Sequence, residues 1–463
     1  MNCTRRAFLG STAAPLLAPA LRAQKGPASA RSNLVLIVAE DLAAWMLGCY
    51  GNLEIKTPHI DRLASSGTRF LDHFLCTPAS SASRATLLTG RLPRQHGIAD
   101  YLTSAPRQDP ERGQSAPPPS FASEVLLSDL LSSAGYRCAF VGRWDLGGDE
   151  RPGHGFSETA TLPAPAVSTG PSLFLNGQSS SESGPTPAVL TRHASAFLDR
   201  QSSSAPFFLV VSYPAAGPSY DALAPKYADL YKNASFQTLG IQPASSSALE
   251  GKQMLADPLG SIRRAAAAIS ALDEQVGALQ DSLFRRGLFE TTLVIFTSVT
   301  GQLLGRHGLW GAGYASDPPN FFDESIRTPL ILSWPGRFPT QSSRPELVSL
   351  ADLFPTVCDA LAVAPPSGRN LSGRSYLTLA SGKPLPKRHP WPDLVCGEMR
   401  AAAMARDNRF KLILRPETLG PDEFFDLRND RGERTNDYAN PSFVDARNRL
   451  AGELRTWRDR YSG

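Results

Sequence analysis

The stretch Asn33-Leu34-Val35-Leu36-Ile37-Val38-Ala39 is an apolar run behind one polar residue, and Glu40 and Asp41 follow it directly. The run has the length of a β-strand and lacks the polar alternation of a strand with one face in water. Strands that are buried on both faces are typical of parallel sheets covered by helices. We therefore expect Asn33–Ala39 to be such a strand, with two acidic residues at its carboxyl end.

Further apolar runs of this kind recur along the chain, and helical patterns lie between them. The clearest helical pattern covers Ser261–Arg286, and a shorter one covers Asp61–Gly67. Strands that alternate with helices predict an α/β fold, with a mainly parallel central sheet flanked by helices. The other runs expected to form strands are Cys138–Val141, Phe207–Ser212, Leu293–Ser298 and Leu330–Trp334.

The end of the chain has a different pattern. Gly, Pro and basic residues recur in 366–395, which we interpret as a linker between a main domain (31–365) and a C-terminal subdomain (396–463). In this subdomain, Ala401–Leu414 and Glu423–Leu427 predict a small antiparallel sheet, whereas the periodicity after it predicts a helix over Phe443–Tyr461.

Stretches rich in Ser, Pro, Ala and Gly predict surface insertions, because they cannot bury enough apolar surface to fold alone. They are Ser104–Ser120, Thr159–Thr186 and Ser235–Lys252.

The composition of the chain excludes some functions. The chain has 463 residues, of which 41% are hydrophobic, and its net charge of +4 is spread without a basic block. We therefore expect a large apolar core and no binding of nucleic acid. The six cysteines form no CxxC pair. Metal–thiolate chemistry is thus not expected, and a disulfide pairing cannot be assigned.

The N-terminus is interpreted as an export signal. Thr4-Arg5-Arg6-Ala7-Phe8-Leu9-Gly10 resembles the twin-arginine pattern, and a weakly apolar Ala/Leu/Pro stretch follows it. Residues 1–30 are therefore expected to be a twin-arginine signal peptide that directs the protein to the periplasm or the extracellular space. No other segment has the unbroken apolar length of a membrane span, so none is expected. The oligomeric state is left open.

The run Ser80-Ser81-Ala82-Ser83-Arg84-Ala85-Thr86-Leu87-Leu88-Thr89-Gly90-Arg91 combines a small hydroxyl residue, a Ser-Arg pair three and four places on, and Leu-Thr-Gly-Arg. This spacing resembles the signature of the sulfatase family. More segments in the family's order support the resemblance: Gly48–Asn52, Thr57–Ala64, Gly142–Gly147, Leu272–Gly277, Asp352–Thr356 and Phe425–Leu427. The resemblance implies an alkaline-phosphatase-like α/β fold and arylsulfatase-like hydrolysis of sulfuric esters.

The resemblance also implies roles for individual residues. Ser80 holds the place of the catalytic residue that the family oxidises to formylglycine, and Arg84 that of the arginine bracing the formylglycine and the metal. Glu40 and Asp41 hold two metal-binding carboxylate positions, and Arg143 holds a cationic substrate-binding position. The implied cofactors are formylglycine at Ser80 and a divalent cation, usually calcium.

Other positions depart from the family pattern. After the strand Leu293–Ser298, the family carries its remaining metal ligands, but this chain has Val299 and Thr300. Val299 cannot coordinate a cation, and Thr300 offers only a neutral hydroxyl. Asp145 stands in place of a histidine. At the positions of a further histidine and a lysine, the chain carries Gly217 and Ala312, respectively. These departures weaken the case for calcium.

Two interpretations of function follow, and a third is weaker. The departures predict an impaired or non-catalytic sulfatase relative that binds a sulfated or otherwise anionic carbohydrate. The alternative is an active sulfate- or phosphate-ester hydrolase that uses Ser80, as formylglycine or unmodified, with a rearranged metal site. A scaffold partner of active sulfatases is the third, and no dedicated binding module supports it.

Overall fold

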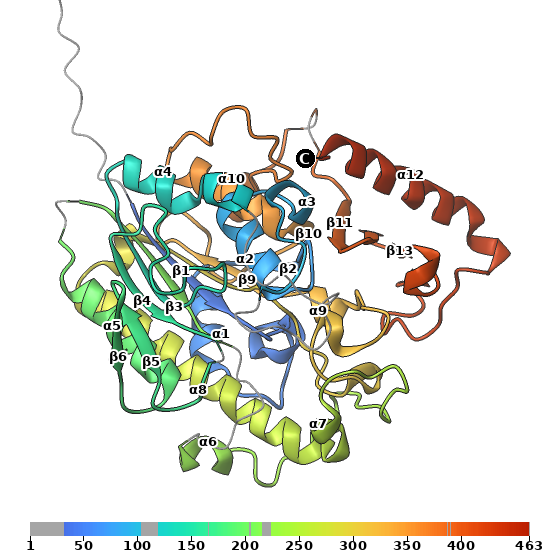
Figure 1. Cartoon of the computed structure of the whole chain (residues 1–463), viewed down its shortest axis with the longest axis horizontal. Helices are drawn as coiled ribbons and strands as arrows, with labels where there is room; N and C mark the ends of the chain where they lie inside the picture. Colours follow the sequence, from blue (N-terminus) through green and yellow to red (C-terminus); the bar gives the residue numbers. More distant parts are fainter. Residues whose placement is uncertain are drawn as a thin grey trace, which may run out of the picture. The chain divides into compact units, whose positions relative to one another are not determined.

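The computed structural model describes residues 32–102, 119–164, 166–202, 205–214, 224–386, 388 and 390–462 (Figure 1). Ser32–Gly463 forms one compact unit. The expected signal peptide, residues 1–30, lies outside the described residues. Within the described ranges, no helix has both the length and the apolar character needed to cross a membrane.

The core of the fold is a ten-stranded sheet with the order β10-β2-β9-β8-β1-β7-β3-β4-β5-β6. The strand β1 lies in its interior and pairs in parallel with β7 and β8. The strands are β1 (Asn33–Ala39), β2 (Thr68–Phe74), β3 (Arg137–Arg143), β4 (Glu158–Leu162), β5 (Ser172–Leu175), β6 (Gln178–Ser181), β7 (Phe207–Ser212), β8 (Thr292–Ser298), β9 (Leu330–Ser333) and β10 (Ser342–Ser349).

The sheet is mixed, although parallel pairing dominates its centre, so the predicted α/β class is confirmed. The strand β9 runs antiparallel to both β2 and β8. The stretch Thr159–Thr186 was expected to be an insertion but contributes to β4, β5 and β6, which extend the sheet. Its few apolar side chains, such as Leu162 and Leu173, are buried in the core, and their spacing among Ser and Gly residues hid the strands.

The other two expected insertions have different outcomes. Most of Ser104–Ser120 lies outside the described residues. The segment Ser235–Lys252 contains no helix or strand before α7 begins at its last residue, in agreement with the prediction.

Helices cover both faces of the sheet, because alternate residues of β1 belong to two different apolar cores. Leu34, Leu36 and Val38 pack in the core that includes α2, α4 and α10, whereas Val35 and Ile37 pack in the core that includes α1, α5 and α8. Figure 1 shows these two groups on opposite sides of the sheet. The helices are α1 (Pro58–Ser65), α2 (Ser80–Thr89), α3 (Pro93–His96), α4 (Leu127–Ser133), α5 (Thr186–Asp199), α6 (Pro225–Asp229), α7 (Lys252–Ala256), α8 (Pro258–Arg285), α9 (Asp323–Ile326), α10 (Leu353–Ala360), α11 (Leu377–Ala380) and α12 (Val444–Arg460).

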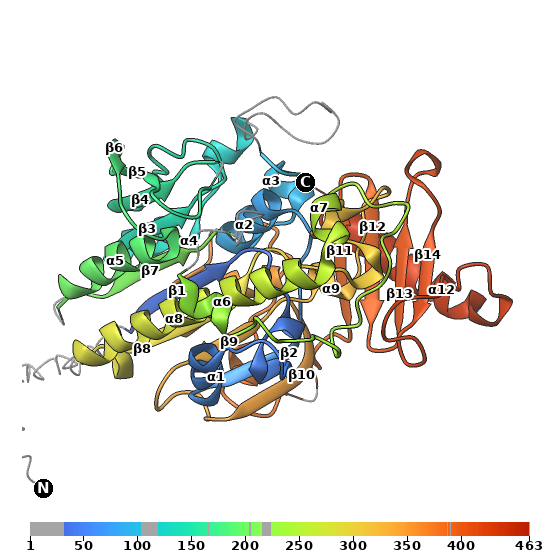
Figure 2. The ribbon, with the colours of Figure 1, turned by 90° about the horizontal axis from the view of Figure 1, so that it is seen from below.

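A second, four-stranded antiparallel sheet stands near the C-terminus, as predicted (Figure 2). The helix α12 packs on this sheet through Leu450 and Leu454, which contact the apolar cluster around Leu412 and Phe424. The strands are β11 (Leu394–Met399), β12 (Ala402–Asp407), β13 (Phe410–Leu414) and β14 (Glu423–Asp426).

Candidate functional site

The predicted site residues meet at one edge of the central sheet. In the parallel ladders, Ala39 at the end of β1 pairs with Ser298 at the end of β8, and Val38 pairs with Ser212 at the end of β7. The strand β3 lies beside β7 and ends at Arg143. The carboxyl ends of parallel strands are where open α/β sheets place their ligands. The residues that follow β1 and β8 therefore lie at the same edge of the sheet as the end of β3.

The carboxylate of Glu40 is held by two arginines. Its Oε2 accepts a hydrogen bond from Nη2 of Arg84 at 3.2 Å and lies 3.7 Å from Nε of Arg143. Glu40 and Arg84 are both buried, with exposed fractions of 8% and 3%. Burial lowers the pKa of Arg84, although the charge of Glu40 acts in the opposite direction. The charge of Glu40 is also the main cause of the raised pKa of Arg143.

Arg84 is fixed by further contacts. Its Nη1 donates to the backbone carbonyl of Arg143 at 3.1 Å and to the hydroxyl of Ser212. The hydroxyl of Ser212 in turn donates to the same carbonyl at 2.9 Å. Ser212 was not predicted as a site residue, because its only signal is its place at the end of a predicted strand.

Asp41 pairs with Thr300 across the ends of β1 and β8. The backbone N–H of Asp41 donates to Oγ1 of Thr300 at 2.8 Å, and that hydroxyl donates to Oδ1 of Asp41 at 3.0 Å. Burial and the charge of Glu40 raise the pKa of Asp41 to about 7, although the hydrogen bond from Thr300 opposes them. Thr300 thus acts here as a hydrogen-bond partner of a carboxyl group.

Val299 contributes an apolar side chain at the position where the family carries a metal ligand. It is fully buried and belongs to the apolar core on the α2 side of the sheet. Its backbone N–H donates to the carbonyl of Ala39 at 3.0 Å and so extends the contact between β1 and β8. The side chain at this position is therefore part of the core packing.

Ser80 lies at the start of α2 and faces Asp145. The hydroxyl of Ser80 donates to Oδ2 of Asp145 at 3.0 Å, and the hydroxyl of Ser81 donates to the same oxygen at 2.9 Å. The other oxygen of Asp145 lies 3.3 Å from Nη2 of Arg143. Ser80 is fully buried. Asp145, which stands where the family has a histidine, is thus hydrogen-bonded to the candidate nucleophile Ser80.

The lysine position of the family shows a related change. Ala312 is buried there, and Glu250 lies close by: its Oε2 would be 3.6 Å from a Cβ built on Gly311. The charge of Glu250 also contributes to the raised pKa of Asp41. Glu250 comes from the Ser-rich segment Ser235–Lys252, where no motif could have identified it. Gly217 lies outside the described residues.

These side chains do not form a calcium donor set. Calcium takes six to eight oxygen ligands, mainly from carboxylates, carbonyls and water. Here the carboxylate of Glu40 is engaged by arginines, and Val299 has no oxygen in its side chain. Among the described residues, no group of three or more His, Cys, Asp and Glu side chains is arranged to hold a metal ion.

The fold, with its mainly parallel central sheet and its separate C-terminal antiparallel sheet, is alkaline-phosphatase-like. The Sulfatase family model matches residues 32–363, and the model for the C-terminal region of N-sulphoglucosamine sulphohydrolase matches residues 313–460. The chain belongs to the sulfatase family, which confirms the resemblance inferred from the signature around Ser80.

Several relatives and solved structures are similar to the chain. It is 28% identical to steryl-sulfatase of Mus musculus (81% of this chain, 69% of the relative) and 29% identical to N-acetylgalactosamine-6-sulfatase of Rattus norvegicus (74% and 65%). It therefore spans about two thirds of the length of these curated relatives. A structure solved with its substrate D-glucosamine-2-N,6-O-disulfate has a TM-score of 0.78 at 20% identity, covering 93% of this chain and 98% of that one. The phosphonate monoester hydrolase of Agrobacterium radiobacter has a TM-score of 0.71 at 23% identity, covering 93% and 96%.

Proposed function

We propose that this member of the sulfatase family is impaired in, or has lost, metal-dependent hydrolysis of sulfate esters, and that it binds a sulfated or otherwise anionic carbohydrate. The observation that carries the proposal is the pairing of Glu40 with Arg84 and Arg143. A carboxylate that is neutralised by buried arginines has little charge left to attract a cation.

The surroundings of Ser80 support the same conclusion. Sulfate transfer requires stabilisation of negative charge on the transferred group, and preorganised cations provide most of it. Each such group commonly contributes about 3 kcal/mol, although the contributions seldom add. Here the carboxylate of Asp145 is within hydrogen-bond distance of Ser80, and it would repel a sulfate ester at that position. Arg143 remains the candidate substrate-binding cation, but it is paired with Glu40 and Asp145.

The carbohydrate part of the proposal draws on the comparisons. One similar structure holds D-glucosamine-2-N,6-O-disulfate, and another is a complex with k-i-k-neocarrahexaose. Both ligands are carbohydrates bound by proteins of this fold. The chain's own ligand is proposed to belong to the same chemical class.

A turnover assay tests the loss of hydrolysis. Purified protein is incubated with an aryl sulfate and with D-glucosamine-2-N,6-O-disulfate in the presence of calcium, beside a Ser80→Ala variant. We expect the wild type to show at most slow turnover, close to the background rate of Ser80→Ala. Robust turnover by the wild type that Ser80→Ala abolishes would contradict the proposal. Mass spectrometry of the Ser80 peptide shows in the same preparation whether formylglycine is present.

One observation favours an active hydrolase as the second candidate. The 3.0 Å hydrogen bond from Ser80 to Asp145 places a carboxylate where a general base would act on an unmodified serine. Such an enzyme would turn over a phosphate or phosphonate ester, and both Ser80→Ala and Asp145→Asn would abolish the turnover. Equal inertness of the three proteins on a panel of sulfate, phosphate and phosphonate esters rules this candidate out.

We also propose that the protein is exported through a twin-arginine signal to the periplasm or the extracellular space. The support is the Arg5-Arg6 pair in its apolar context. An Arg5→Lys/Arg6→Lys variant is expected to accumulate unprocessed in the cytoplasm of a bacterial host. Unchanged export of this variant would contradict the proposal.

A further inference from the structure

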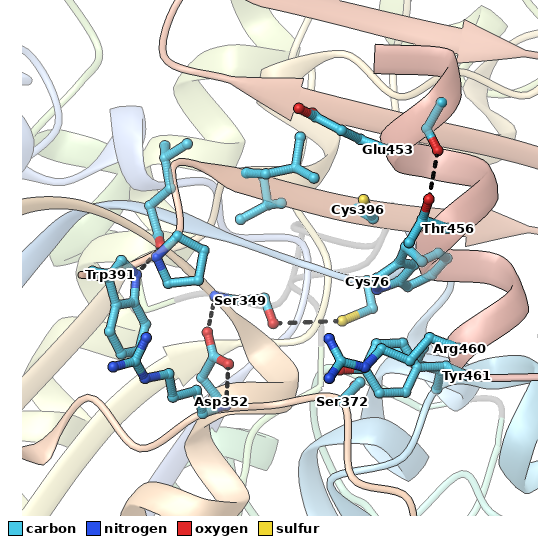
Figure 3. Close-up of a pocket in the computed structure, with 18 of the residues that line it drawn as sticks. Cys76, Ser349, Asp352, Ser372, Trp391, Cys396, Glu453, Thr456, Arg460 and Tyr461 are labelled. Atoms are coloured by element: carbon cyan, nitrogen blue, oxygen red, sulfur yellow. Dashed lines mark hydrogen bonds between the residues drawn. The ribbon is translucent and has the colours of Figure 1, made fainter. Parts of the chain in front are cut away.

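A second cavity lies between the C-terminal helix and the main body of the fold, and Figure 3 shows it. It has a volume of about 670 Å³ and is lined by residues of β10, β11 and α12, together with the segments that follow β2, β10 and α10. Among the described residues, neither Ser80 nor the arginines and carboxylates around it line this cavity. Its size falls within the range of sites for small ligands.

We propose that this cavity is where the protein binds its anionic saccharide, an inference that rests on the function proposed above. At the ancestral site, Arg84 and Arg143 are already committed to carboxylates. An anion bound there would have to compete with Glu40 and Asp145 for these guanidinium groups. An arginine in the second cavity has no such competitor.

That arginine is Arg460, which is exposed near the end of α12. Its guanidinium lies 5.9 Å from the ring of Tyr461, and the close-up shows it directed into the cavity (Figure 3). Among the described residues, no carboxylate lies within ion-pair distance of it, whereas its neighbour Arg449 pairs with Asp407 and Glu453. A planar guanidinium binds sulfate or carboxylate groups through two parallel hydrogen bonds.

Ser372 supplies a second feature that points to a ligand. The residue lines the cavity, and its Oγ is buried beneath the cavity surface with no hydrogen-bond partner among the described residues. Buried polar atoms are nearly always satisfied, so we infer that this hydroxyl turns towards the cavity and bonds to a polar ligand there. In Figure 3 it lies beside the guanidinium of Arg460. A sulfated or carboxylated sugar could engage both groups at once.

The remaining walls suit the body of a sugar. Trp391 and Trp457 provide aromatic surface, which packs against the apolar C–H faces of sugar rings. The carboxylate of Asp352 accepts hydrogen bonds from the backbone N–H groups of Ser349 and Arg374 at 2.7 Å each. A carboxylate has further lone pairs, so Asp352 can also accept from sugar hydroxyl groups.

Calorimetric titration of the full-length mature protein with D-glucosamine-2-N,6-O-disulfate at low salt tests the inference. Loss of a charge-assisted contact in Arg460→Gln should weaken binding at least roughly tenfold. Ser372→Ala should weaken it by a few fold without loss of stability, because the hydroxyl has no protein partner to lose. Arg455→Gln is the matched control, since Arg455 is an exposed arginine of α12 that does not line the cavity, and its affinity should equal that of the wild type.

Two results would overturn the inference. One is equal affinity of wild type, Arg460→Gln and Ser372→Ala, particularly if Arg143→Gln alone abolishes binding, which would place the ligand at the ancestral site. The other is no detectable binding of the disulfate to the wild type. The proposed loss of hydrolysis is tested separately: turnover that depends on Ser80 would contradict that proposal without bearing on where the saccharide binds.

Discussion

The carboxylate of Glu40 lies 3.2 Å from the guanidinium of Arg84, and both side chains are almost fully buried. Removing two charges from water costs several kcal/mol per ion, and this cost is offset only when each charge has a close partner. The pair therefore stabilises the folded state only as long as both members are present. Under the proposed function, this pair supplies the charge balance that the family assigns to a divalent cation.

The pair predicts a large effect of Glu40→Gln. The substitution leaves the buried guanidinium of Arg84 without its counter-charge, so the free energy of unfolding should fall by about 3 kcal/mol or more. Urea unfolding at neutral pH measures this change. A loss below about 1 kcal/mol, in the range of an exposed ion pair, would show that the pair carries little of the charge balance.

Asp41→Asn is the matched comparison for Glu40→Gln. The pKa of Asp41 is raised to about 7 by burial and by Glu40, so its ionised form is disfavoured in the folded state. The stabilising contribution of this group is therefore lost as the pH rises from about 3.8 to about 7, and the loss is complete above that range. Asn cannot ionise, can still accept from Thr300, and tolerates the left-handed backbone of this position (φ 53°). Above neutral pH, the free energy of unfolding of the variant should thus equal or exceed that of the wild type. A clearly lower value would contradict the raised pKa of Asp41.

Restoring the two lost ligands should restore a response to calcium. In Val299→Asp/Thr300→Asn, a new carboxylate replaces a fully buried apolar side chain, so the variant should be less stable than the wild type without metal. Calcium should then raise its melting temperature, whereas the wild type should show no shift. Differential scanning calorimetry with and without calcium measures both effects. A calcium-dependent shift of the wild type that equals the variant's would contradict the prediction.

His96 predicts a loss of stability in acid. Burial, together with the charge of Arg91, lowers the pKa of His96 to about 3. Its Nδ1 accepts from the backbone N–H of Ile98 at 3.2 Å, a bond that the protonated ring could not accept. Stability is complete above the unfolded pKa of about 6.5 and is lost as the pH falls towards 3. When the pH falls from about 8 to about 5, titration of His96 should lower the free energy of unfolding by about 2 kcal/mol.

Urea unfolding of a His96→Gln variant at these two pH values isolates that contribution. The variant cannot take up the proton, so its unfolding free energy should depend less on pH than that of the wild type. If the variant loses as much stability between these pH values as the wild type, groups other than His96 cause the loss.

Much of the fold could be predicted because buried parallel strands consist of continuous apolar runs in the sequence. The strand Phe207–Ser212 was predicted with its exact bounds, and Asn33–Ala39 was recognised from its composition. The strands within Thr159–Thr186 were not, because Ser and Gly obscure the alternation of Leu173 and its neighbours. The antiparallel direction of β9 has no local signal, since it depends on how the chain returns to the sheet.

The sequence indicated which candidate residues follow the strand ends, but it did not indicate their contacts. Parallel strand ends necessarily meet at one edge, so Glu40 and Thr300 could be expected near each other. The pairing of Glu40 with Arg84 depends on how α2 lies against that edge, and sequence spacing does not encode it. Glu250 comes from an irregular segment, where neither periodicity nor a motif marks a functional side chain.

A calcium titration of the purified protein, followed by isothermal calorimetry and by elemental analysis after dialysis, tests most directly whether arginines have replaced the cation. We expect no saturable heat and no stoichiometric calcium, with the Val299→Asp/Thr300→Asn variant binding calcium in the same experiment. One equivalent of calcium retained by the wild type, and lost on substitution of Glu40 or Asp41, would contradict it.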